Sequence, residues 1–403
     1  MSLTKVPQHP CPIIASIQIN TWVSLSRDPQ IAKSGLLRPL LPHVFLQCLA
    51  ASKKVDWEHV ESGEHPLADL YEEAWCDCDD YESWANDFRG KLGMLVKIMS
   101  AMDPNAASTF LSERLDETLA TYGYSPGDDA TTITELESLS LFMDNVLQGC
   151  CAMATNLPSV AVQNLGKVAT QVVAWNPVTL KTLTRKCAWT ESLRHFWVHD
   201  TQTNSLPGAV EAMFVLLSAR DDPASTAPIL NQEQLSPDTV LLRRKAGSAL
   251  VGIGKSCDAK LVSYVGQLAE RSSQLMNANV LLPNQKQHLI EFLTCVASAV
   301  DDVQQKTSFV SSMVGESLNY LTSPEFTSLV ASADSLLSQL GITNATPQSV
   351  VDVGTVNSTS TVYSKLFSAL NQLLSVGKRC HESKGNNKLY TKAGAAEMQV
   401  SHA

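Results

Sequence analysis

The sequence predicts an all-α protein, an α-solenoid built from HEAT-like helix pairs. Apolar residues recur at helical spacing in about fourteen separate stretches, most of them joined by short polar connections. These stretches pair at a period of roughly 40–47 residues, which is typical of HEAT-type repeats. Only the stretch from Val350 to Val356 approaches the alternation of a β-strand, and Gly354 weakens it. A hydrophobic content of 44% with only 6% aromatic residues suits helices that pack through aliphatic side chains.

The expected helices follow one another along the chain, and proline stands in the first turn of several, such as those that begin near Pro158, Pro207 and Pro283. Proline fits there because the first amides of a helix have no partner within that helix. The expected helical ranges are 12–25, 31–52, 84–101, 105–122, 132–154, 158–174, 178–198, 207–217, 238–254, 257–276, 283–300, 303–319, 324–340 and 361–376.

Composition divides the chain into four parts. A solenoid is expected over 12–340, a linker rich in Gly, Thr, Asn and Ser over 341–360, a further helix over 361–376 and a flexible tail over 377–403. Within the solenoid, 53–83 shows little periodicity and is expected to be a loop. Loops of this length are uncommon inside compact domains and are usually functional or disordered.

The expected loop is strongly acidic, and aromatic residues alternate with acids from Trp75 to Trp84. Two interpretations remain open. The first is a solvated loop that its aromatic side chains pin to the solenoid. The second is a docking surface for a basic partner, because opposite charge attracts and orients such a partner. The candidate partner-binding residues are Asp77, Asp79, Asp80 and Glu82.

Three consecutive cations, Arg243, Arg244 and Lys245, stand near the start of the helix expected over 238–254. Cations there oppose the helix macrodipole, which favours acids at the N-terminus. Such a local conflict suggests a ligand-facing role, with arginine suited to a bidentate grip on phosphate. A solvated helix-end face is the alternative. Lys286 adds a cation to the first turn of the helix that begins at Pro283.

The sequence contains no complete pattern of catalytic, nucleotide-binding or metal-ligating residues. The run 254–256 resembles the end of a phosphate loop, but Ala249 occupies the position of its first glycine and the preceding residues predict a helix. His195 and His199 are one helical turn apart, yet Phe196 stands where a zincin needs glutamate. The sequence therefore predicts neither an enzyme nor a cofactor or metal site.

Charge and cysteine usage narrow the class of protein further. The formal charge of -10 excludes general attraction to nucleic acid, so an RNA surface would have to be a local basic patch. The ten cysteines have no repeating frame, and only 76/78 and 150/151 lie close together, which is typical of reduced intracellular thiols. No signal peptide or apolar run of membrane-spanning length is present, so no membrane insertion is expected.

Several short runs, in order along the chain, resemble the exportin-5 family of nuclear export receptors, within the karyopherin or importin-β superfamily. The resemblance spans nearly the whole chain and corresponds to a central to C-terminal segment, without the N-terminal repeats of the family. The runs that carry it are 26–29, 75–84, 242–246, 281–293, 303–313, 364–367 and 377–380.

The resemblance implies a nuclear export receptor segment that binds structured RNA, such as a pre-microRNA or a tRNA-like hairpin, or an RNA-binding protein, together with Ran-GTP. It also implies shuttling between nucleus and cytoplasm, with nucleoporins as further partners. Pro283 and Asn284 depart from the local pattern of the family. Carried onto this sequence, the RNA-binding residues are Arg243, Arg244, Lys245, Asn284, Gln285 and Lys286, and the Ran- or partner-binding residues are Asp77, Asp79, Asp80 and Glu82.

The alternative function is an α-solenoid scaffold that binds protein only and has no RNA role. The two functions differ in a measurable way. A receptor that contacts phosphates loses affinity for hairpin RNA steeply as salt rises, whereas a protein scaffold has no such affinity to lose.

Overall fold

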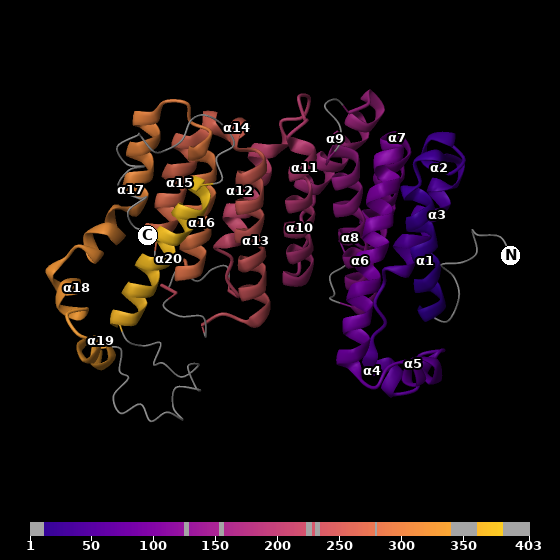
Figure 1. The fold of residues 1–403 in the computed structure, drawn as a ribbon, viewed down its shortest axis with the longest axis horizontal. Coiled ribbons are helices and arrows are strands. Elements are labelled where there is room, and N and C mark those ends of the chain that lie inside the picture. The colour runs from indigo at the N-terminus through magenta and orange to yellow at the C-terminus, as the bar shows by residue number, and fades with distance from the viewer. Residues whose placement is uncertain are drawn as a thin grey trace. The chain divides into compact units, whose positions relative to one another are not determined.

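The computed structural model describes residues 12–124, 129–152, 157–222, 228–229, 234–278, 280–339 and 361–381. These residues form α-helices and short 3-10 helices, and this described part of the chain contains no strand (Figure 1). The predicted all-α solenoid is confirmed. The backbone contacts divide the chain into two compact units. Unit 1 comprises Met1–Ala219 with Ser236–Ala249, and unit 2 comprises Arg220–Leu235 with Leu250–Ala403.

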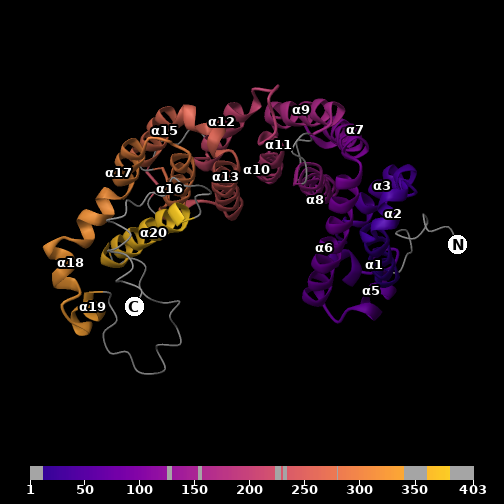
Figure 2. The same ribbon diagram turned by 45° about the horizontal axis from the view of Figure 1, so that its top comes forward.

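Unit 1 is built from two rows of helices that pack against each other. One row runs through α6, α8 and α10, and the other through α7, α9 and α12, with each helix packed against the next in its row (Figure 2). The helices are α1 (Pro12–Arg27), α2 (Pro29–Ser34), η2 (Arg38–Leu40), α3 (Leu41–Ala51), α4 (Trp57–Glu61), α5 (Ala68–Ala74), α6 (Cys78–Met102), α7 (Pro104–Tyr122), α8 (Ala130–Ala152), α9 (Ser159–Ala174), α10 (Leu180–Ser192), α11 (Arg194–Trp197), α12 (Ser205–Leu217) and α13 (Pro237–Ser256), whose last turns belong to unit 2.

Unit 2 is organised around α16, which packs against α14, α15, α17 and α20. A small core joins Ile290 of α16, Val314 of α17 and Val376 of α20. Burying such aliphatic side chains contributes roughly 1.5–3 kcal/mol each. The remaining helices of the unit are α14 (Asp258–Leu261), η4 (Val262–Tyr264), α15 (Val265–Asn277), α16 (Pro283–Ser298), α17 (Val303–Leu321), α18 (Pro324–Leu329), α19 (Ala333–Gln339) and α20 (Thr361–His381).

The acidic segment, defined here as residues 55–84, differs most from the sequence-based expectation. The sequence predicts a loop over 53–83, but these residues contain α4, α5 and the start of α6. Its aromatic residues explain the difference, because Trp57, Tyr71, Trp75 and Tyr81 are buried together in one cluster. The buried face of the segment combines these aromatics from α4, α5, its C-cap and α6 with the small aliphatic residues Val60, Ala68 and Ala85.

Several other expected boundaries also change, and the helices expected over 178–198 and 324–340 are each divided in two. The helix expected over 31–52 is divided into α2, η2 and α3, because Gly35 ends α2 in the left-handed region with φ 74°. At the other end, α20 continues to His381, beyond the expected helix end at 376 and into the expected tail. The expected linker 341–360 and the rest of the expected tail, 382–403, lie outside the described residues.

Candidate interaction surfaces

Arg243 does not face solvent, contrary to its sequence-based assignment as an RNA-contacting residue. Its side chain is 0% exposed, and its Nε donates a hydrogen bond of 2.8 Å to the main-chain oxygen of Leu217. Leu217 is the last residue of α12, where carbonyl groups have no partner within the helix. The guanidinium therefore stabilises the C-terminus of α12, and a buried side chain of this kind cannot grip a phosphate.

The same arrangement recurs in both units. Lys186 of α10 is 5% exposed and donates to the main-chain oxygens of Val173, at 3.0 Å, and Trp175, at the C-terminal end of α9. Lys306 of α17 is 2% exposed and donates to the Ser298 oxygen, at 2.9 Å, at the end of α16. Burial lowers the pKa of the Lys186 ammonium. In each case a cation from the following helix compensates the negative end of the preceding one.

This arrangement accounts for the electrostatic conflict at the start of α13. Arg243 opposes the dipole of its own helix but neutralises the C-terminus of α12. Lys186 lies six residues after the first residue of α10, Leu180, and Arg243 lies six residues after the first residue of α13, Pro237. Lys306 lies three residues after the first residue of α17, Val303, so the shared feature is the contact with the preceding helix end and not a fixed position.

The neighbouring cations of α13 remain candidates for a ligand surface. Arg244 and Lys245 are both exposed, on the side of the helix that Arg243 does not occupy. Helical geometry explains the difference, since successive residues are rotated by about 100° around the helix axis. The basic run therefore contributes two solvent-facing cations, not three.

The first turn of α16 also divides into buried and accessible residues. Asn284 is exposed and Lys286 is half-buried. Gln285 is only 2% exposed, and its Oε1 accepts a 2.8 Å hydrogen bond from the amide of Leu282. This contact is one half of a capping box, so the Gln285 side chain stabilises the start of α16 and is not accessible to RNA.

The acidic segment presents its carboxylates to solvent over the aromatic cluster. Eleven Asp and Glu residues lie between Asp56 and Glu82, and no Lys or Arg occurs between Lys54 and Arg89. Asp77, Asp79 and Asp80 are exposed at the start of α6. Asp77 is also the N-cap, with its Oδ1 accepting from the amide of Asp80 at 2.9 Å.

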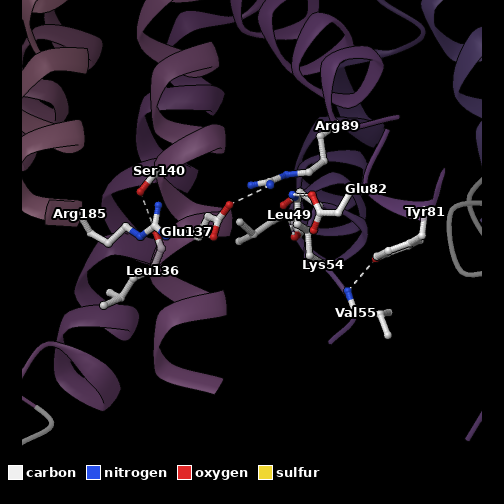
Figure 3. A network of polar contacts seen from close by, with 11 residues as sticks. Leu49, Lys54, Val55, Tyr81, Glu82, Arg89, Leu136, Glu137, Ser140 and Arg185 are labelled. Atoms are coloured by element: carbon white, nitrogen blue, oxygen red, sulfur yellow. Dashed lines mark hydrogen bonds and ion pairs between the residues drawn. The ribbon is translucent and has the colours of Figure 1, made fainter. Parts of the chain in front are cut away.

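Glu82 differs from the other candidate acids because it is half-buried and pairs with Lys54 (Figure 3). Nearby, the amide of Val55 donates to the hydroxyl oxygen of Tyr81 at 2.8 Å. Burial raises the pKa of that tyrosine. These contacts fasten the acidic segment to the end of α3. Asp77, Asp79 and Asp80 are exposed, whereas Glu82 is half-buried in an ion pair.

A network that the sequence did not indicate joins three helices of one row. Glu137 of α8 accepts from Arg89 of α6 at 2.9 Å and from Arg185 of α10 at 3.0 Å (Figure 3). Burial alone would raise the pKa of Glu137, but Arg185 and Arg89 together hold it below its ordinary value. The partners lie 48 residues away on either side, a separation that no local motif could reveal.

The remaining chemical patterns have structural roles. Gly254 lies within α13, and a Cβ there would come within 2.7 Å of the Phe292 ring, so the glycine permits close helix packing. His199 Nε2 lies 3.1 Å from the main-chain oxygen of Cys151, while His195 faces Asp144 at 3.9 Å. Among the described residues, no three His, Cys, Asp or Glu side chains are grouped to hold a metal ion.

A comparison with protein families matches residues 2–402 to the Exportin-5 family. The chain belongs to the Exportin-5 family. The match extends over nearly the whole sequence and both units, which agrees with the all-α solenoid architecture described above. A comparison with curated proteins gives no match.

Members of the Exportin-5 family are nuclear export receptors, transport proteins and not enzymes, so the chain has a general role in nucleocytoplasmic transport. Transport receptors of this kind move between nucleus and cytoplasm with a cargo. Within the described part of the chain, no helix has the length and apolar character needed to cross a bilayer.

Proposed function

We propose that this Exportin-5 family chain binds structured small RNA, such as a pre-microRNA or a tRNA-like hairpin, or an RNA-binding protein, together with Ran-GTP for export from the nucleus. The observation that carries the proposal is the family match over residues 2–402. Exposed cations on α13 and α16 and exposed acids at the start of α6 also support the proposal. Nucleoporins would be further partners during passage between nucleus and cytoplasm. In this proposal the basic surface binds the RNA cargo and the acidic surface binds Ran-GTP.

The RNA-contacting residues in this proposal are Arg244, Lys245, Asn284 and Lys286, without the buried Arg243 and Gln285. Exposed cations suit the phosphates of an A-form helix, which proteins recognise mainly by shape and backbone contacts. An exposed asparagine adds a neutral hydrogen-bonding group that can reach a ribose hydroxyl or a phosphate. Because the chain carries a formal charge of -10, such contacts must be local.

Asp79 and Asp80 are the strongest candidates for contact with Ran-GTP or another basic partner. Both are exposed in the first turn of α6, and the surrounding segment contains no Lys or Arg to compensate them. Asp77 contributes charge while it also caps the helix. Linkage would then make cargo and Ran-GTP binding mutually reinforcing if both favour the same state of the solenoid.

The second candidate function is a protein-binding scaffold without an RNA role. The burial of Arg243 and Gln285 favours it, because two of the six predicted RNA-binding residues serve the fold instead. A solenoid can still present a broad surface to protein partners in that case.

The proposal is tested by titrating the 403-residue chain with an RNA hairpin that carries a two-nucleotide 3′ overhang. We expect Arg244→Glu combined with Lys245→Glu to weaken binding at least tenfold at low salt. Wild-type affinity should fall steeply as salt rises, and the variant should show a shallower salt dependence. Addition of Ran-GTP should tighten wild-type binding.

A matched control is Lys33→Glu combined with Arg38→Glu, which makes the same charge change at two exposed cations of α2 and η2. This control should retain wild-type affinity apart from a small general charge effect. If both double variants weaken binding equally, the surface of α13 has no specific role. If the wild-type chain does not bind the hairpin at any salt concentration, the scaffold function is the better description.

A further inference from the structure

A groove of about 760 Å³ opens in unit 1 where α6 meets α8 and the end of α1. This volume is within the range of known ligand sites, about 300–1,000 Å³. None of the RNA- or Ran-binding candidates lines it. Its wall consists of side chains from α6 and α8, with Arg27 of α1 at one edge.

Small residues shape the groove by letting the two helices approach. A Cβ on Gly149 of α8 would come within 2.3 Å of the Lys97 carbonyl oxygen of α6, and a Cβ on Gly93 would overlap the amide of Asn145. Larger residues at these positions would force the helices apart. By contrast, a Cβ on Gly90 would have no atom within 4 Å, so that position opens onto free space along the groove.

The side chains that line the groove are mainly apolar. Met94 is 42% exposed, and Ile98, Ala101 and Met102 continue the apolar surface along α6. Methionine is flexible and polarisable, and it is common at surfaces that adapt to apolar side chains of a partner. Leaving these groups in water costs free energy that a docked apolar partner would recover.

Two cations flank the apolar surface, and the side chains that they contact are uncharged. Arg27 Nη2 lies 2.8 Å from the sulfur of Met94, and Lys97 Nζ donates to the Gln148 side-chain oxygen at 2.9 Å. In the same row of helices, Arg89 and Arg185 both reach the carboxylate of Glu137. The described residues that line the groove include no Asp or Glu. Gln148, which lines the groove, donates from its side-chain amide to Asp144 of α8 at 2.7 Å.

We propose that this groove docks an acidic amphipathic peptide segment of a partner protein. Its aliphatic side chains would cover Met94, Ile98 and Met102, and its carboxylates would approach Arg27 and Lys97. Docking of an amphipathic helix into an apolar groove is a common recognition mode, with anchors at i, i+3, i+4 and i+7. A protein segment suits the groove better than RNA, because phosphates gain nothing from an apolar methionine surface. The proposal does not depend on RNA binding by α13.

The test begins with a displayed library of 16-residue peptides. Four positions on one helical face carry Leu, Ile, Met or Phe, and the flanking positions carry either Glu or Lys with equal frequency. Selection on the 403-residue chain should enrich peptides with Glu at the flanking positions. Enrichment of Lys-rich peptides, or no enrichment, would overturn the proposal, because the library contains Glu and Lys peptides at equal frequency.

A groove-filling variant locates the binding site. Gly90→Phe adds a Cβ that meets no atom within 4 Å and carries a bulky ring at the edge of the groove, so the fold should be retained. We expect it to weaken binding of the selected peptides at least tenfold. Gly266→Phe, at an exposed glycine of α15 whose added Cβ also meets nothing within 4 Å, is the matched control and should leave binding unchanged. Equal binding by wild type and Gly90→Phe would place the peptides elsewhere and refute the proposal.

Charge exchange tests the polarity of the groove. Arg27→Glu combined with Lys97→Glu should weaken binding of the selected acidic peptide at least tenfold and restore binding of its Lys-substituted counterpart. Circular dichroism before and after heating checks that the variant is folded. Competition by hairpin RNA, with no preference among peptides, would assign the groove to nucleic acid and exclude the peptide site.

Discussion

The start of α13 and the acidic segment both carry runs of like charge, but the two regions use charge in opposite ways. In α13 one member of the run, Arg243, is fully buried while Arg244 and Lys245 are exposed. In the acidic segment the aromatic residues are buried and nearly all carboxylates face solvent. The position of a charge around its helix, and not its membership of a run, decides whether it serves the fold or a partner.

The reason lies in what each helix packs against. The start of α13 lies beside the C-terminus of α12, whose last carbonyl groups have no partner within that helix. Arg243 is buried because its side chain donates to one of these carbonyl groups. The short helices α4 and α5 lie over an aromatic cluster with few polar groups, of which the Trp57 ring nitrogen donates to the Glu61 carboxylate at 2.8 Å. Acids there remain in water because burying an unpaired charge is costly.

The largest effect is expected from Trp75→Ala in the acidic segment. Trp75 is buried, with ring centroids 5.1 Å from Tyr71, 5.3 Å from Tyr81 and 4.7 Å from Trp84. Its removal should lower the free energy of unfolding by about 3–5 kcal/mol. Urea unfolding followed by circular dichroism measures this, and exposed Asp79→Ala is the control, expected within about 1 kcal/mol of wild type. Similar values for the two variants would contradict the division between buried aromatics and exposed acids.

A smaller loss is expected from Arg243→Met. Methionine keeps much of the volume but cannot donate to the Leu217 oxygen, so the free energy of unfolding should fall by about 2–3 kcal/mol. Arg244→Met, one residue further along the same helix, should change it by less than about 0.5 kcal/mol. Denaturant unfolding of both variants sharpens the comparison within one basic run. An Arg243 variant as stable as the Arg244 variant would show that the buried cation is dispensable.

The smallest effect, and a pH-dependent one, is expected from Glu137→Gln. The folded-state pKa of Glu137 is below its ordinary value of 4.5, so the ionised form contributes stability that is complete above about pH 4.5 and is lost as pH falls through the folded pKa. At pH 7 the variant should be less stable by about 1 kcal/mol. The difference from wild type should shrink as the pH is lowered towards 3. A difference that stays constant or grows on acidification would mean that the charge of Glu137 is not what joins α6, α8 and α10.

The fold was predictable because most helices carry an aliphatic stripe, which can be recognised without knowing what the helix packs against. The helices of the acidic segment were missed although Ala68, Tyr71 and Trp75 have helical spacing, because the dense acids concealed it. The role of Gln285 had a local signal, since Gln at the third helical position is typical of a capping box. The burial of Arg243 could have been suspected from Lys186 at the same position of α10.

Other features had no local signal. The Glu137 network joins residues 48 positions apart, and the close approach of α6 and α8 beside the groove depends on Gly93 and Gly149. Such sites depend on which helices become neighbours and how closely they pack. Periodicity shows that a helix has a buried face, but it does not identify the residue across from it.

The buried cations have a practical consequence for dividing the chain. Each one lies on the helix that follows the carbonyl groups it compensates, so the connection between the two helices holds together an acceptor and its donor. A protease cut or a fragment boundary between Ser218 and Ser236, or between Ala299 and Asp302, would separate the two partners. One fragment would keep carbonyl groups without their donor, and the other would keep a cation without its acceptor. Fragments of the chain should therefore keep α9 with α10, α12 with α13 and α16 with α17.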